Sequence, residues 1–209
     1  MLTLERARGW YSETDAVHGF DHIERVYSLC EIIGEKEGAD LEILRAAALL
    51  HDARGSHPGL GQRENHHVES AAFAQEILSQ EGWPSSKINA VKHCILSHRF
   101  RKDAPPETIE ARVLFDADKL DVIGAIGVVR ALAYAFQART PAFALPSEQF
   151  MQSGKVLPGE AHSAYHEYLF KLKHVSSLLF TETAKEIAVQ RQAFLNAFFD
   201  TLKSEMQPE

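Results

Sequence analysis

The segment RAAALLHDARG, residues 45–55, predicts an interior helix that ends in two polar side chains. Its centre, Ala46 to Leu50, has almost no polar face, so a helix there must be covered by other parts of the chain. His51 and Asp52 follow directly, and an isolated carboxylate costs several kcal/mol to take out of water even after the protein relaxes. We therefore expect a partner for these side chains at the end of this helix.

Composition indicates a single globular domain over residues 1–209, with 45% apolar and 24% charged residues. No window approaches the apolar length of a membrane span, and the charged start MLTLERARGW is not typical of a signal peptide. Cys30 and Cys94 predict reduced, buried thiols. We expect a cytoplasmic protein without a membrane partner. The net charge of -7 argues against a nucleic-acid polymer as partner, but it allows a small phosphorylated substrate.

Hydrophobic periodicity predicts an all-α fold, because helical spacing recurs along the chain and no alternating strand pattern occurs. Gly38 is expected to end one helix and Asp40 to cap the next. Residues 139–160 carry several Pro and Gly and predict a long irregular loop, followed by C-terminal helices over 162–206. The expected helices cover residues 2–12, 20–37, 41–52, 66–80, 85–99, 106–115, 117–138, 162–180 and 182–206.

Helical phase places a set of ionisable side chains on or beside apolar stripes near helix ends. If consecutive helices run antiparallel, these residues meet at one end of the bundle. Arg25 lies on the edge of the same stripe as the first of them. The set is His22, His51, Asp52, His67, His98, Asp118 and Asp121.

The same phase predicts that several neighbouring side chains point elsewhere. His66 and His93 are rotated away from the stripes of their helices, and Asp116 lies across its helix from Asp118. His162, His166 and His174 are expected at the surface.

A metal ion explains how carboxylates gather in this interior. Asp52 and Asp118 cannot share a buried pocket without positive charge, and a divalent cation satisfies two imidazoles and two carboxylates together. A single histidine of this kind, such as His22 taken alone, is more often a hydrogen-bonded core residue than a metal ligand. The combination of two imidazoles and two carboxylates is what favours a metal.

These residues resemble the HD-domain family of metal-dependent phosphohydrolases. The segments HGFDHIERV (18–26) and AALLHDARG (47–55) are similar to the first two motifs of that family. LFDADKLDVIGAIGVVRA (114–131) resembles the DADRLDAIGAIG stretch of one bacterial subfamily, and the segment 181–199 is similar to its tail.

The resemblance implies an HD-type helical bundle, with a metal-binding core at about 18–138. Its implied ligands to one divalent ion are His22, His51, Asp52 and Asp118. Mn, Mg, Fe, Co, Ni and Zn are not distinguished by these residues. His67 and His98 resemble the extra histidines of dinuclear relatives. We expect them to face substrate phosphate, and a second metal at these two is the alternative.

The expected activity is hydrolysis of a small phosphorylated metabolite, a nucleotide above all, by metal-activated water. Either a nucleoside triphosphate loses pyrophosphate, or a phosphoester is cleaved by a nucleotidase or phosphodiesterase. A di-iron oxygenase on the same scaffold and a non-catalytic sensor or adaptor are the alternatives.

The site residues carry expected roles in that reaction. Asp52 also orients the nucleophile, while Asp121 acts as general base, binds a ribose hydroxyl or orients a ligand histidine. His67 and His98, if protonated, bind phosphate or assist the leaving group. Arg25 binds phosphate or pairs with a neighbouring carboxylate, and Lys171 completes the pocket or is solvated.

Overall fold

The computed structural model describes residues 2–11, 19–54, 65–99 and 105–207, and this part of the chain contains helices and no strand. The all-α prediction is confirmed. The chain divides into two compact units. Unit 1 comprises Met1–Asp118 and Leu179–Ala184, and unit 2 comprises Lys119–Leu178 and Lys185–Glu209.

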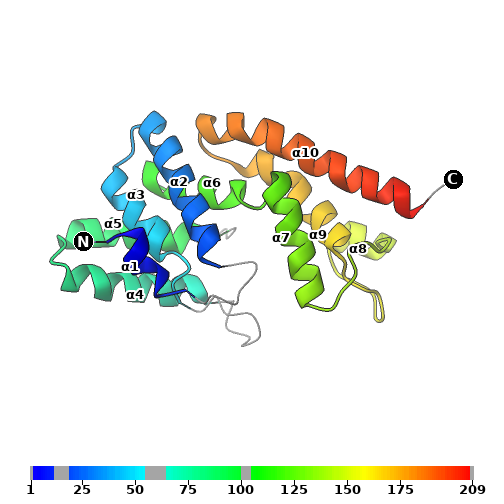
Figure 1. Cartoon of the computed structure of the whole chain (residues 1–209), viewed down its shortest axis with the longest axis horizontal. Coiled ribbons are helices and arrows are strands. Elements are labelled where there is room, and N and C mark those ends of the chain that lie inside the picture. The colour runs from blue at the N-terminus through cyan, green and yellow to red at the C-terminus, as the bar shows by residue number, and fades with distance from the viewer. Residues whose placement is uncertain (1, 12–18, 55–64, 100–104, 208–209) are drawn as a thin grey trace. The chain divides into compact units, whose positions relative to one another are not determined.

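Unit 1 is built around helix α3 (Leu41–Leu50), which contacts four other helices (Figure 1). These are α1 (Leu4–Arg8), α2 (Phe20–Glu37), α4 (His66–Gln80) and α5 (Ser85–Ser97). Every residue from Ala46 to Leu50 is at most 1% exposed, so the helix is interior as predicted. Helix α6 (Ile109–Leu120) contributes most of its length to this unit.

The turn between α2 and α3 forms as the sequence predicts. Gly38 ends α2 with a left-handed backbone (φ 71°), and its N–H donates to the carbonyl of Gly34. The Asp40 side chain caps α3 by accepting hydrogen bonds from the N–H groups of Glu42 and Ile43. The two helices are thereby held as neighbours.

The predicted break at residue 116 is wrong, because α6 continues to Leu120 and α7 (Gly124–Gln137) begins only after a turn. Gly124 adopts a φ of 76°, a backbone conformation that residues other than glycine rarely adopt. A Cβ on Gly127 would lie 2.3 Å from the carbonyl oxygen of Val122. The two glycines therefore permit a turn that periodicity alone does not reveal.

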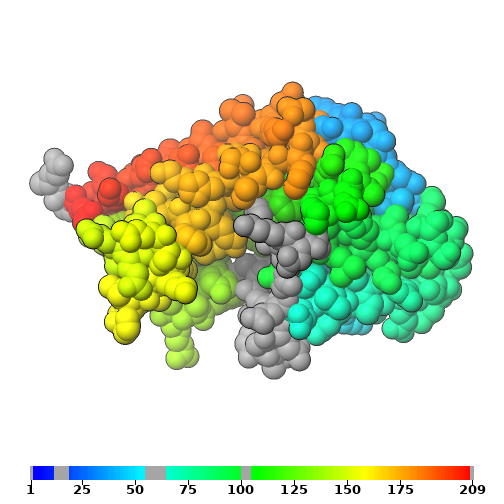
Figure 2. Space-filling model, turned by 180° about the vertical axis from the view of Figure 1, so that it is seen from behind, coloured from blue at the N-terminus to red at the C-terminus, as the bar shows by residue number. Residues whose placement is uncertain are grey.

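Unit 2 packs short helices along the long helix α10 (Glu182–Met206), of which Glu182–Ala184 belong to unit 1. Its further elements are α7, α8 (Glu148–Ser153), α9 (Ala164–Phe170) and the 3-10 helix η2 (Leu172–Leu178). Tyr168 of α9 stacks on Phe199 of α10 with ring centroids 4.4 Å apart. Figure 2 shows the outer surfaces of α8, α9 and α10 side by side. The expected irregular loop thus contains α8, and the expected helix 162–180 is replaced by α9 and η2.

His166 is fully buried, so the prediction that it lies at the surface was wrong, whereas His174 is exposed as predicted. The His166 ring caps α9 together with Ser163, and His166 Nε2 lies 3.2 Å from Glu160 Oε1. Glu160 also accepts hydrogen bonds from the N–H groups of Leu157 and Ser147, which lower its pKa to about 2. His166 therefore fastens the loop that precedes α9.

Among the described residues, no single helix has the length and apolar character needed to cross a membrane; the bent pair α6 and α7 passes that test only when taken together.

Asp116 anchors the start of α10 from the face of α6 that lies away from Asp118. Its carboxylate is fully buried and accepts hydrogen bonds from the N–H groups of Phe180 and Thr181. The Thr181 hydroxyl also donates to it at 2.7 Å, and the same hydroxyl accepts from the N–H of Ala184. The predicted direction of Asp116 is confirmed, and its contacts are structural.

We predict that Asp116→Asn lowers the free energy of unfolding by about 2–4 kcal/mol, because charge-assisted bonds to buried N–H groups are lost. Chemical denaturation measures this. Asp200→Asn on the exposed face of α10 is the control and should change stability little. Equal stability of the two variants would refute the anchoring role of Asp116.

We predict that Gly127→Ala destabilises the protein by about 1–3 kcal/mol, since the new methyl group meets the Val122 carbonyl rather than a movable side chain. Gly9→Ala is the matched control, because a Cβ there has only an ordinary contact at 3.7 Å. Thermal unfolding of both variants checks the prediction, which fails if Gly127→Ala is as stable as the control.

Candidate metal centre

The end of α3 presents His51 in a fixed orientation. Its Nδ1 lies 2.8 Å from the carbonyl oxygen of Ala48, and because a carbonyl only accepts, Nδ1 carries the proton. The lone pair therefore belongs to Nε2, which is buried and has no hydrogen-bond partner among the described residues. A buried acceptor of this kind is a ready metal ligand.

His22, His51 and Asp118 form the first donor group. Each offers one ligand atom, and the three atoms all lie within 4.8 Å of one another. His22 Nε2 is 3.5 Å from Asp118 Oδ1. His22 stands near the start of α2 as predicted, whereas Asp118 stands near the end of α6 instead of near the start of a longer helix. Two imidazoles and a carboxylate suit a divalent transition metal.

Asp52, His66 and His98 form the second donor group, whose ligand atoms also lie within 4.8 Å of one another. Asp52 Oδ1 is 3.3 Å from His66 Nε2 and 3.6 Å from His98 Nε2. His98 repeats the arrangement of His51, because its Nδ1 lies 2.6 Å from the carbonyl of Ile95. Asp52 Oδ2 is 3.9 Å from His51 Nε2, so the two groups adjoin at the His51–Asp52 pair.

The histidines keep Asp52 ionised. Burial alone would raise the pKa of this carboxyl. Interactions with the imidazoles of His51, His66 and His98 outweigh burial, and the pKa of Asp52 lies well below its usual range. A carboxylate held in this state binds a cation without first losing a proton.

His66 faces the site, so the prediction that it points away was wrong. It is the first residue of α4, and Asn65 before it is not helical. Helical phase is set by the residues on both sides, and a side chain in the first turn leans toward the N-terminus. His66 therefore reaches Asp52, while His67 is buried next to it with its ring centroid 5.8 Å from that of His66.

The remaining predicted site residues lie as follows. Arg25 pairs with Asp21 at 2.6 Å, one turn away on α2. Asp121 is buried and forms an ion pair with Arg130 in unit 2. Lys171 is exposed and pairs with Glu167 at 2.9 Å, also in unit 2. The structure does not bring these three into either donor group.

Tyr11 is a residue that helical phase did not single out. Its hydroxyl donates to the carbonyl of Leu49 at 2.9 Å, at the end of α3. Burial and then the charge of Asp52 raise its pKa well above the usual value. It holds the backbone that carries His51 and Asp52, and only a three-dimensional structure reveals this contact.

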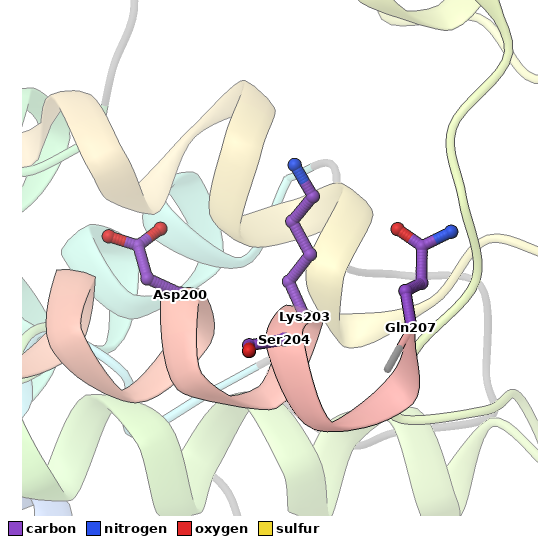
Figure 3. Close-up of a pocket in the computed structure, with 4 residues that line it drawn as sticks. All are labelled: Asp200, Lys203, Ser204 and Gln207. Atoms are coloured by element: carbon purple, nitrogen blue, oxygen red, sulfur yellow. The ribbon is translucent and has the colours of Figure 1, made fainter. Parts of the chain in front are cut away.

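A hollow of about 810 Å³ lies elsewhere, on the surface of α10 in unit 2. Its lining side chains project from successive turns of that helix (Figure 3). They are Asp200, Lys203, Ser204 and Gln207. All are exposed, which is typical of a solvated helix face.

An all-helical unit with His and Asp donor groups at helix ends defines the class of metal-binding HD domains. The sequence model of the HD domain matches residues 19–123, and the chain belongs to this family. HD domains bind divalent metals, and the two donor groups have the chemistry to hold such an ion.

Relatives that match nearly the whole length of the chain support this assignment. The uncharacterized protein YpgQ of Bacillus subtilis is 31% identical over 211 residues, covering 97% of this chain and 93% of that protein. A crystal structure of YpgQ in complex with ADP superposes with a TM-score of 0.74 and 29% identity, over 99% of each chain.

A predicted HD superfamily hydrolase from an uncultured Thermotogales bacterium gives a TM-score of 0.65 at 25% identity, over 98% of this chain and 91% of that one. The chain therefore has the fold of the HD-superfamily hydrolases, and these neighbours support a hydrolase. The family expectation is confirmed, while membership in the DADRLDAIGAIG-type subfamily stays a prediction.

We predict that Asp118→Ala lowers Mn²⁺ affinity by at least about 10-fold, since metal-site contacts are worth factors of this order. Isothermal titration of the metal-free protein measures the affinity. Asp116→Ala is the neighbouring control, because its carboxylate binds backbone N–H groups instead, and the variant should bind Mn²⁺ nearly as the unaltered protein does at a temperature where it remains folded. Equal losses in the two variants would contradict the first donor group.

Proposed function

We propose that the protein is a metal-dependent phosphohydrolase that acts on a small phosphorylated metabolite, in particular a nucleotide. The observation that carries the proposal is the first donor group, in which His22, His51 and Asp118 offer ligand atoms within 4.8 Å of one another in a buried setting. The ADP bound by YpgQ, a relative along its whole length, supports a nucleotide as ligand.

His22, His51 and Asp118 would hold a divalent ion, and Asp52, whose Oδ2 lies 3.9 Å from His51 Nε2, would be its fourth ligand. When bound, such an ion acidifies a water molecule and offsets the negative charge that develops on phosphoryl oxygens. The bond from His51 Nδ1 to Ala48 keeps the ring in the tautomer that can bind a cation. Asp52, kept ionised by its neighbours, would orient the water that attacks phosphorus.

The histidines around Asp52 would serve the departing group. In their protonated forms His66 and His98 can each donate a proton from Nε2, which lies 3.3 and 3.6 Å from Asp52 Oδ1 respectively. His67 keeps its proposed contact with phosphate. Arg25 and Lys171 are retained as substrate-binding residues and Asp121 as a general base, each requiring release from its present ion-pair partner.

The second donor group favours a second candidate, a centre with two ions. Asp52, His66 and His98 adjoin the first group through the His51–Asp52 pair. Two ions about 3.5–4 Å apart serve both phosphoesterases and, when they are iron, oxygenases. The di-iron oxygenase is separated from the hydrolase by its dependence on iron and oxygen.

The test is a screen of the Mn-loaded protein against nucleoside mono-, di- and triphosphates, with phosphate and pyrophosphate measured separately. We expect one product from at least one nucleotide, and Asp118→Ala should lower kcat by at least about 100-fold because charge stabilisation at the reacting phosphate is lost. Iron-dependent oxygen consumption without either product would favour the oxygenase. Tight nucleotide binding without turnover under any metal would favour a sensor.

A further inference from the structure

An anionic substrate meets an electrostatic obstacle at this site. Asp52 and Asp118 lie within the two donor groups, and the whole chain carries a net charge of -7. A divalent ion would offset the charge of these two carboxylates, and a cationic side chain next to it would add guidance and a hydrogen-bonding partner for a phosphate group. Arg25 is bound to the Asp21 carboxylate at 2.6 Å, so its use by substrate requires that ion pair to break.

Arg54 offers a cation beside the same site, and within the described part of the chain it forms no such ion pair. It is exposed and follows Asp52 by two positions at the end of α3. Among the described residues, its guanidinium makes one hydrogen bond, from a terminal nitrogen to the carbonyl of Ala53 at 2.9 Å. A carbonyl is neutral, so the positive charge of Arg54 is not cancelled by this contact.

The guanidinium is held in place by stacking. Its central carbon lies 3.6 Å from the ring centroid of Phe73, a close cation–π contact. Phe73 is in turn fixed by an edge-to-face contact with Trp10, with centroids 5.3 Å apart at 85°. Phe73 covers one face of the guanidinium and not its edge, where the N–H groups lie in the fork geometry that binds phosphate.

The backbone of Arg54 is fixed by a fully buried serine. The N–H of Arg54 donates to Ser70 Oγ at 3.1 Å, and that hydroxyl donates to the carbonyl of Arg54 at 3.2 Å. The distance between this residue and the His51–Asp52 pair is therefore set by α3 and α4 together.

We propose that Arg54, stacked on Phe73, binds a phosphate group of the substrate next to the metal centre. The inference rests on the proposed function and names a residue that substrate recognition uses. The ligand class is a phosphate or pyrophosphate group in which two oxygens face the guanidinium fork.

The test measures binding instead of turnover. Inorganic pyrophosphate and ADP are titrated calorimetrically into the full-length, Mn-saturated protein and into Arg54→Gln, with metal content checked in each. We expect Arg54→Gln to weaken both probes by about 10- to 100-fold at unchanged metal content, since a hydrogen bond to a charged group is lost. Arg45→Gln is the matched control, because Arg45 lies on α3 but pairs with Glu31, and it should bind both probes normally.

Two conservative variants separate recognition from structure. Arg54→Lys keeps the charge but not the fork, and Phe73→Leu removes the stacking surface, so each should weaken binding less than Arg54→Gln does. The inference on Arg54 is overturned if Arg54→Gln binds both probes as the unaltered protein does, or if its weaker binding follows only from lost metal. Failure of the unaltered protein to bind either probe would count against the proposed function itself.

Discussion

The burial of ionisable side chains at helix ends is the constraint on which this site depends. His51 is fully buried, and His22, Asp52 and His98 are nearly so. Their contacts with one another lower the cost of burying charge, and a cation shared by imidazole and carboxylate lowers it further. His51 and Asp52 are buried because they directly follow α3, whose apolar centre has no polar face and lies in the interior.

Local geometry at the ends of two helices orients the buried side chains so that they form a binding site. His51 and His98 each end a helix and each bond through Nδ1 to the carbonyl three residues earlier, so the same local arrangement directs two Nε2 atoms toward Asp52. Asp52 then stands between the two donor groups, which makes both a one-ion and a two-ion centre chemically accessible. Residues outside the groups have separate tasks: Asp116 anchors α10, and Tyr11 holds the end of α3.

Much of this arrangement could be predicted from the sequence, because periodicity reports which side of a regular helix is buried. It correctly separated Asp118 from Asp116 and identified α3 as interior. It was wrong for His66, since phase is poorly defined at the first residue of a helix, and for His166, whose burial depends on contacts with the loop before α9.

The turn between α6 and α7 depends on Gly124 and Gly127, whose role appears only when the backbone of Val122 is in place. Stacking of Arg54 on Phe73 joins the turn after α3 to α4 and leaves no periodic signal.

Anomalous diffraction from a crystal of the Mn-containing protein tests the account most directly, because it locates the ion without relying on activity. The account predicts a peak in direct coordination contact with His22 Nε2, His51 Nε2 and a carboxylate oxygen of Asp118. Manganese peaks that lie only away from these three side chains, in a crystal where the side chains are clearly resolved, would contradict it.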